Sequence, residues 1–350
     1  MSVKKDTYNY GIAFTKVFLS FCVVCSHFWN PGDLAYYPVA MLNRMRGAAV
    51  PIFVLMAFFL TEKIFVDKNA PKIKIRVERL LVPYLSWPVL YFVGYRVIDV
   101  FLKHFGFSLR LGTGYTWRDL LWQLAFGHEK NLCGHLWYLF DLIVISVAVW
   151  ILFKCCDKYS WHILILLGIA AVWLQYSGMN YSVFNQYIYE KRYPLGRLAE
   201  VFPLACAGLL LAHSNILEKM KRHRVYVVFL CIVTMLMIAY GNIFTSLEGF
   251  GYAGIYLVVY STLAFICFYE FPFECMGNGI KAVLRFLSKY SLGVYCLHMG
   301  VGHCWNRIVC AVTGWRGYTL MGCMAIFAIC LFVSWLISRI PVKYAKQLVE

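Results

Sequence analysis

The chain alternates between long apolar stretches and short polar segments. Ten stretches are predicted as helical spans, at residues 11–29, 48–62, 80–102, 134–153, 161–177, 197–213, 225–240, 251–270, 288–304 and 319–338. About 20 apolar residues cross the hydrocarbon core of a bilayer as one helix, and no stretch has the alternating pattern of a membrane β-strand. The pattern therefore predicts an all-α, polytopic membrane helical bundle with about ten transmembrane helices, forming one integral domain over residues 1–350.

Composition and charge agree with this prediction and add an orientation. Hydrophobic residues make up 61% of the chain and charged residues only 14%, which excludes an ordinary soluble domain. The net charge of +16 is spread over short segments and forms no basic domain or stripe, so we expect no nucleic-acid partner. Most Lys and Arg fall in alternate segments that include both ends of the chain. The positive-inside rule then predicts a multi-pass protein of the plasma (bacterial inner) membrane with both termini cytoplasmic.

Familiar soluble-enzyme signatures are absent from the sequence. There is no nucleophile elbow, phosphate loop, dinucleotide fingerprint or zinc signature. The 14 cysteines are scattered, and Cys22-x-x-Cys25 has no second pair, so no metal site is expected. The basic start is followed by an apolar stretch without a small-residue cleavage site, so we interpret that stretch as a retained span. The candidate chemistry therefore rests on polar groups within the spans.

The first span carries two such groups, Lys16 and His27. Eleven residues at about 100° each return nearly to the starting direction, so both side chains fall on one stripe of the helix, about 16 Å apart along its axis. Polar groups inside a membrane usually face a cavity or a partner. In the predicted topology Lys16 lies toward the cytoplasm and His27 toward the outside, which indicates a polar path into the membrane.

A second cationic feature opens the third span. Arg76 and Arg79 are spaced i, i+3, so both project from one helix face and can bind a phosphate group together. The nearby lysines are better explained as cytoplasmic anchors. A histidine can take a proton from a hydroxyl that attacks an acyl carbon, and Lys16 with the two arginines suits a multiply charged phosphate head. Acyl-CoA, with a charged head and a long thin arm, fits that arrangement.

Other polar residues leave alternatives open. His135 lies at the outer mouth of the fourth span, and Asp141, deeper in it, is equally well explained as a structural ion-pair partner or a functional group. Arg197 and Glu200, one turn apart, are expected to neutralise each other. The Tyr- and Asn-rich segment 177–194 suits either a sugar or a membrane interface, and Asn180 begins a glycosylation sequon.

Several of these motifs also occur in one known family. Lys16 and His27 resemble an Arg-x10-His motif, with lysine at the arginine position, and Arg76 to Arg79 (RVER) resembles an Arg-x-x-Arg motif. Residues 46–60 (RGAAVPIFVLMAFFL) resemble a second span, with Met56-Ala57 replacing the common Ser-Gly. HLWYL at 135–139 resembles HLWFL, and GRLAEVFPLACAGLLL and LSKYSLGVYCLH, which ends in His298, resemble later spans. Across nearly its whole length the chain resembles the acyltransferase 3 family of integral membrane O-acyltransferases.

The resemblance implies a function and a role for each matched residue. The implied enzyme moves an acyl group, commonly acetyl, from cytoplasmic acyl-CoA (acetyl-CoA) to a hydroxyl of an extracytoplasmic glycan or lipid-linked sugar, without a metal. The resemblance implies that the catalytic residues are His27 and His298. It implies donor binding by Lys16, Arg76 and Arg79, and acceptor binding by His135, Trp137 and Tyr138. The alternatives are a transporter or flippase for a glycan-linked or acylated molecule, and a non-catalytic membrane partner or sensor. A transporter usually needs broken helices in an inverted repeat, which the sequence does not show.

Overall fold

The computed structural model describes residues 8–29, 45–104, 114–127, 133–180, 194–220, 225–234, 236–237, 255–314, 319–342 and 344–350. All regular structure in these residues is helical, which confirms the predicted all-α class for this part of the chain. The longer helices are α1 (Tyr10–Phe28), α3 (Ala49–Phe59), α5 (Ala70–His104), α6 (Trp117–Phe126), α7 (Trp137–Cys156), α8 (Ser160–Asn180), α10 (Pro194–His213), α13 (Ile255–Glu270), α14 (Asn278–Lys289), α15 (Ser291–Thr313) and α16 (Leu320–Ser338).

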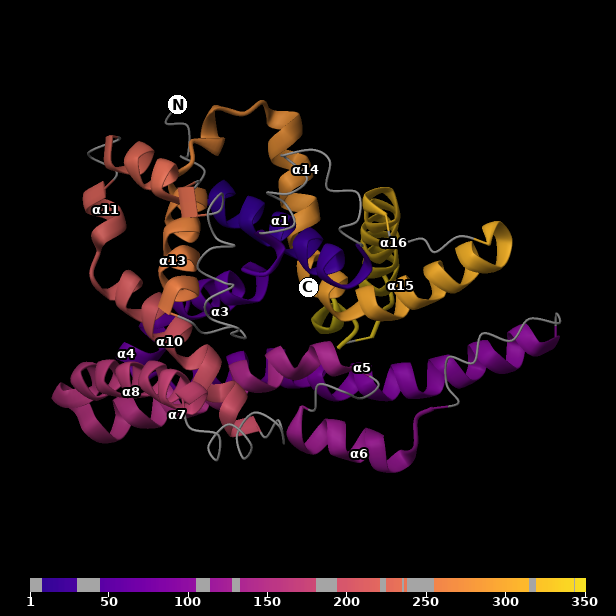
Figure 1. Ribbon diagram of the computed structural model, residues 1–350, viewed down its shortest axis with the longest axis horizontal. Coiled ribbons are helices and arrows are strands. Elements are labelled where there is room, and N and C mark those ends of the chain that lie inside the picture. The colour runs from indigo at the N-terminus through magenta and orange to yellow at the C-terminus, as the bar shows by residue number, and fades with distance from the viewer. Residues whose placement is uncertain are drawn as a thin grey trace.

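The first helix, α1, lies at the centre of the bundle. It contacts α3, α13, α14, α15 and α16, which surround it in Figure 1. The helices α5, α7 and α8 run along the lower edge of that view, with α6 below α5. Cys22, Val24 and Cys25 of α1 are fully buried. The helix that carries the predicted Lys16–His27 stripe is therefore packed on most of its sides.

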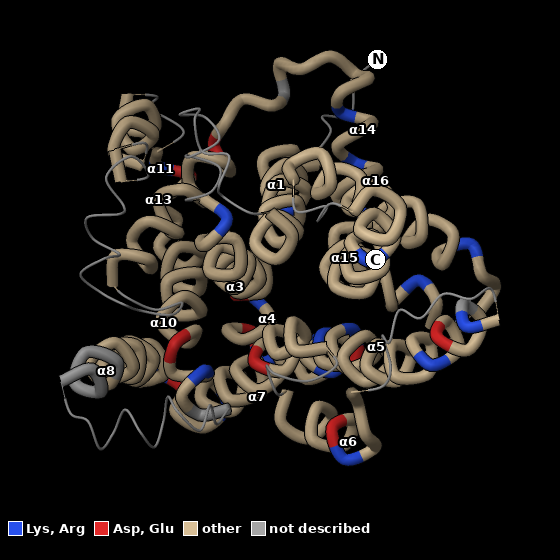
Figure 2. The backbone as a smooth tube through the Cα atoms, turned by 45° about the vertical axis from the view of Figure 1, so that its right-hand side comes forward, with Lys and Arg blue, Asp and Glu red and all other residues tan. Residues whose placement is uncertain are grey.

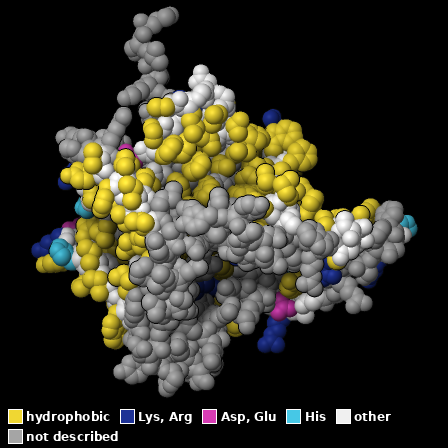
Figure 3. All heavy atoms as spheres, turned by 45° about the horizontal axis from the view of Figure 1, so that its top comes forward, with side chains coloured by type: hydrophobic (Ala, Val, Ile, Leu, Met, Phe, Trp, Pro, Cys, Tyr) yellow, Lys and Arg dark blue, Asp and Glu magenta, His cyan; other side chains and the backbone are white. Residues whose placement is uncertain are grey.

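The membrane assignment is supported by five helical segments that are long and apolar enough to cross a bilayer. These segments are Tyr10–Phe28, Ala70–Phe101, Gly134–Leu174, Gly196–His213 and Leu320–Ser338. Shorter apolar helices occupy Ala49–Phe59, Val225–Thr234 and Ile255–Glu270. Hydrophobic side chains cover much of the described surface in Figure 3, as expected where a protein contacts lipid. The number of ten spans and the cytoplasmic position of both termini stay predictions.

Charge is distributed unevenly over these helices. The helices α3, α8 and α16 carry no Lys, Arg, Asp or Glu, whereas charged positions mark both α5 and α14 (Figure 2). No span is predicted over 271–287, and α14 fills most of this segment. Its apolar residues recur at three- and four-residue intervals, Ile280, Val283, Leu284 and Leu287, which is the pattern of an amphipathic helix.

A short amphipathic helix lies between the third and fourth predicted spans. This helix, α6, packs against α5 and leaves Trp117 67% exposed and Trp122 44% exposed. Thr116 and Asp119 form a capping box at its start. The Thr116 hydroxyl and backbone N–H both donate to the Asp119 carboxylate and hold its pKa below the ordinary value. The apolar face with its exposed tryptophans suits the membrane surface.

The close packing of α3 depends on a glycine of another helix. A Cβ added to Gly208, on α10, would overlap the backbone carbonyl oxygen of Leu55 and lie 3.0 Å from its carbonyl carbon. Contacts this short are not compatible with a side chain unless the backbone moves. The second span has Met56-Ala57 where the resembled family commonly has Ser-Gly, and here the small residue for close approach is supplied by α10.

We therefore expect Gly208→Ala to destabilise the protein by about 1–3 kcal/mol, because the added methyl group overpacks the contact between α10 and α3. Thermal unfolding of the purified protein measures this effect as a lower Tm. The matched control is Gly94→Ala in α5, where no atom lies within 4 Å of the added Cβ. The control should keep or slightly raise the Tm, since alanine favours a helix over glycine. An equal Tm for both variants would contradict the packing role of Gly208.

Candidate active site

Three histidines from distant parts of the chain converge in one cluster. His27 lies in the last turn of α1, His135 in the short 3-10 helix Gly134–Leu136 that leads into α7, and His298 in α15. The ring centroid of His298 is 5.2 Å from that of His27 and 4.9 Å from that of His135. His135 and His298 are buried, whereas His27 is exposed. We call these three residues the histidine cluster.

The cluster forms because α15 packs closely on the end of α1. The ring of Phe28, next to His27, occupies the space where Gly302 of α15 would carry a Cβ. Any larger residue at 302 would push the two helices apart and separate His27 from His298. His303, the residue after Gly302, packs edge-on against the Phe28 ring, with 5.6 Å between the ring centroids. A small residue four positions after His298 thus fixes the approach of two candidate catalytic groups.

Hydrogen bonds to backbone carbonyls determine which nitrogen of each buried histidine is available. The His298 Nδ1 lies 2.6 Å from the Tyr295 carbonyl oxygen, and the His135 Nε2 lies 3.2 Å from the Cys296 carbonyl oxygen. A carbonyl oxygen only accepts, so in each neutral ring the bonded nitrogen carries the hydrogen. The His298 Nε2 and the His135 Nδ1 are then lone-pair acceptors, and both are buried without a partner among the described residues.

Two tyrosines hold the backbone around the cluster. The Tyr295 hydroxyl donates to the His135 carbonyl oxygen. The Tyr91 hydroxyl, from α5, donates to the Cys296 carbonyl oxygen at 2.7 Å and accepts from the Gly300 backbone N–H at 3.0 Å. These bonds tie α5 and the start of α7 to α15. The cluster is therefore held by rigid helices, as a catalytic site requires.

Arg46 is a site residue that the motif analysis did not single out. Its Nη1 donates to the carbonyl oxygens of Cys25 and Trp29, both at 3.1 Å, and its guanidinium lies over the Trp29 ring. The last carbonyls of a helix lack intrahelical partners and attract cations. Arg46 thus caps α1 and places a positive charge beside His27. The sequence signal was present, since an arginine begins the apolar second span, but the sequence does not show that this arginine lies at the end of α1.

The three predicted donor-binding residues have different surroundings. Lys16 is half-buried in α1, and no ion pair joins it to another described residue. Arg76 is largely buried, donates from Nε to the Ser146 hydroxyl at 3.0 Å, and lies over the Phe58 ring. Arg79 is exposed. The described contacts do not bring Lys16 to either arginine, and the two arginines do not form one clamp, because Arg76 points into the bundle.

Of the predicted acceptor-side residues, only His135 belongs to the histidine cluster. Tyr138 packs beside the cluster, with its ring centroid 5.4 Å from that of Tyr295. Trp137 faces away, under the guanidinium of Arg197 at 5.4 Å. Consecutive residues at the start of α7 point about 100° apart, so they cannot all line one cavity.

Asp141 is part of a buried ion pair. Arg197 Nε lies 3.0 Å from Asp141 Oδ2, and Arg197 Nη2 lies 3.0 Å from Oδ1. The side chains are only 10% and 2% exposed. Arg197 Nη1 also donates to the Gly127 carbonyl oxygen at 2.9 Å. The arginine that the sequence paired with Glu200 thus makes a bidentate contact with Asp141, joining α10 to α7, which favours the structural explanation of Asp141.

Comparison with known proteins identifies a family for nearly the whole chain. A family model described as an acyltransferase domain, of the acyltransferase 3 type, matches residues 9–339. No curated protein and no solved structure matches the chain. No group of three or more metal-ligating side chains with the geometry of a metal site occurs among the described residues.

Proposed function

The chain belongs to the acyltransferase 3 family, and from this premise we propose that it is a membrane-bound O-acyltransferase using cytoplasmic acyl-CoA. The expected acyl group is acetyl, and the expected acceptor is a hydroxyl of an extracytoplasmic glycan or lipid-linked sugar. The observation that carries the proposal is the histidine cluster, which places two unpaired, buried imidazole nitrogens beside the exposed ring of His27. A buried nitrogen without a partner is costly unless a substrate or water completes it.

The proposed reaction uses His27 as the general base. His27 removes the proton of the acceptor hydroxyl while the hydroxyl oxygen forms a bond to the thioester carbonyl carbon. The tetrahedral intermediate then expels the CoA thiolate, which is protonated by the His27 imidazolium. Arg46 supplies positive charge near the developing oxyanion, where a fixed charge is most effective. His298, with its lone pair on Nε2, is a second candidate base beside His27.

The donor would approach along α1 from the opposite end. Lys16 and His27 are eleven residues apart on the same helix, which corresponds to about 16 Å. The CoA head would bind near Lys16 and the exposed Arg79, and its pantetheine arm would reach His27. Arg76 would hold α5 against α3 and α7 through Nε and Nη1, while its buried Nη2, without a partner among the described residues, would stay available to the donor.

Transfer of radiolabelled acetyl from acetyl-CoA tests this proposal. Membrane vesicles that contain the protein should transfer label to endogenous glycan or lipid-linked sugar, and vesicles without it should not. Equal labelling of both would contradict the proposal. Passage of an unmodified glycan across the vesicle membrane, without covalent label, would favour the transporter.

The role of Lys16 gives a second, kinetic prediction. Lys16→Gln should raise the KM for acetyl-CoA about tenfold with little change in kcat, because it removes one charged contact to the donor phosphates. Lys16→Arg should keep the wild-type KM. The control is Lys68→Gln, since the exposed Lys68 already pairs with Asp157. A normal KM in Lys16→Gln would remove this residue from the donor site.

A further inference from the structure

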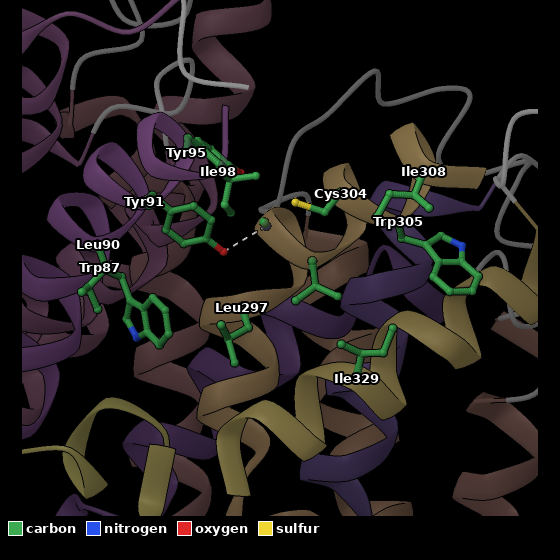
Figure 4. Close-up of a pocket in the computed structure, with 13 residues that line it drawn as sticks. Trp87, Leu90, Tyr91, Tyr95, Ile98, Leu297, Cys304, Trp305, Ile308 and Ile329 are labelled. Carbon is green, nitrogen blue, oxygen red and sulfur yellow. Dashed lines mark hydrogen bonds between the residues drawn. The ribbon is translucent and has the colours of Figure 1, made fainter. Parts of the chain in front are cut away.

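A cavity of about 390 Å³ lies between α5, α15 and α16, next to the histidine cluster. Figure 4 shows Trp87, Tyr91 and Tyr95 of α5 on one side, facing Leu297 and Cys304 of α15 and Ile329 of α16. None of the 13 residues that line it is charged. Its volume is within the usual range of ligand pockets, about 300–1,000 Å³. We call it the α5–α15 pocket.

The rim of the pocket faces the outside of the bundle. Leu90 is 48% exposed, Ile308 is 54% exposed, and both line the pocket. The part of α5 that forms this rim lies in a segment long and apolar enough to span a bilayer. The surroundings of such a segment are lipid hydrocarbon, so an apolar opening at this depth is accessible to a hydrocarbon chain.

The inner wall of the pocket is shared with the histidine cluster. Tyr91 lines the pocket, and its ring lies edge-on to His135 with 6.1 Å between centroids. The Cys296 carbonyl oxygen accepts from both the Tyr91 hydroxyl and the His135 Nε2. Leu297, the residue before His298, also lines the pocket. One layer of side chains therefore separates the pocket from the candidate catalytic groups.

This wall distinguishes two possible hydrocarbon ligands. The acyl chain of a long-chain donor is bonded to the reacting carbonyl, so it would have to pass through the wall to reach the pocket. Tyr91 closes that route, because its hydroxyl is bonded to α15 at both Cys296 and Gly300. The tail of a membrane lipid enters from the rim and leaves its head group outside the pocket. Val301 and Cys304 of α15 line the pocket, and Gly302 and His303 between them contact Phe28, the residue next to His27.

We propose that the α5–α15 pocket binds the hydrocarbon chain of a lipid-linked acceptor and thereby holds its sugar head group near the histidine cluster. This inference rests on the proposed function and selects the lipid-linked sugar among the acceptors. Binding in the pocket does not require turnover, so it is measured separately from acyl transfer.

The test uses a dodecyl glucoside that carries a diazirine at the end of its chain. The probe is irradiated with the full-length protein in nanodiscs of phosphatidylethanolamine and phosphatidylglycerol, and mass spectrometry locates the label. Wild type should be labelled on pocket residues of α5 and α15. Gly94→Phe places a ring in the pocket, where the added Cβ meets no atom within 4 Å, and should lower this labelling about tenfold. The matched control, Val93→Phe, alters the exposed neighbouring position and should label like wild type.

Three results would overturn the proposal. The first is equal labelling of Gly94→Phe and Val93→Phe. The second is competition by palmitoyl-CoA but not by unlabelled dodecyl glucoside, which would assign the pocket to a donor chain. The third is equal competition by dodecyl phosphocholine, which has the same chain without the sugar and would make the pocket a general lipid site. If Gly94→Phe does not fold, Cys304→Phe fills the pocket from α15. If the wild-type protein is labelled in the pocket but transfers no acyl group, the result contradicts the proposed function and leaves the lipid site standing.

Discussion

Replacing His27 with alanine is expected to lower the rate of acyl transfer about 10²–10⁴-fold, the usual contribution of a general base. His27 is the exposed member of the histidine cluster, and its ring nitrogens have no hydrogen-bond partner among the described residues. The KM for acetyl-CoA should change little, because the proposed donor-head contacts lie at the other end of α1. Initial rates of label transfer from acetyl-CoA, measured with equal amounts of purified protein, give both constants.

The matched control for this experiment is His162→Ala. His162 is an exposed histidine of α8, outside the cluster, and its replacement should leave the rate unchanged. The proposed mechanism would be wrong if His27→Ala retained the wild-type rate. If His298→Ala alone lost activity, the base would be His298, whose Nε2 lone pair is fixed by the bond from Nδ1 to the Tyr295 carbonyl.

Replacing Arg197 with alanine is expected to destabilise the fold by about 3–5 kcal/mol. The change leaves the Asp141 carboxylate buried without its bidentate partner, and an uncompensated buried charge is strongly unfavourable. Arg197→Lys should recover only part of the stability, since an ammonium group cannot make both parallel bonds. Thermal unfolding of the purified variants and their yield in membranes measure the loss.

The double variant Asp141→Leu, Arg197→Met separates a structural role from a catalytic one. Two apolar side chains of similar size can replace a buried ion pair at little cost, so the double variant should regain most of the stability lost in Arg197→Ala. Recovery of transfer activity together with stability would show that Asp141 is structural. A stable double variant without activity would instead place Asp141 in the chemistry.

The sequence was sufficient to predict the all-α class of the described residues and the family, whereas the roles of the site residues stay predictions. Long apolar stretches indicated the helices, because a membrane helix must be apolar over most of its length. The family match confirmed the resemblance seen in the motifs. His27 and His298 were chosen from positions 271 residues apart, and the structure places their rings 5.2 Å from each other. The resemblance selected both histidines, but only the structure shows that their rings meet.

What the sequence could not show depends on how the helices face one another. The spacing of Arg76 and Arg79 predicts a shared helix face, but the aromatic rings of α3 and α4 (Glu62–Val66) draw Arg76 inward and leave Arg79 exposed. Arg197 pairs with an aspartate 56 residues away. Arg46 donates to the carbonyl oxygens of Cys25 and Trp29, on either side of His27. Each of these contacts joins different helices, and one sequence contains no record of such pairings.

The central claim is that this chain transfers an acyl group through its histidine cluster. Mass spectrometry of surface glycans and lipid-linked sugars tests it most directly, in host cells that lack the gene and in the same cells that carry wild-type protein or His27→Ala. We predict a glycan or lipid-linked sugar heavier by one acyl group, with acetyl expected, only in the cells that carry wild-type protein. The same mass in all three strains, or the heavier species also with a well-expressed His27→Ala, would contradict it.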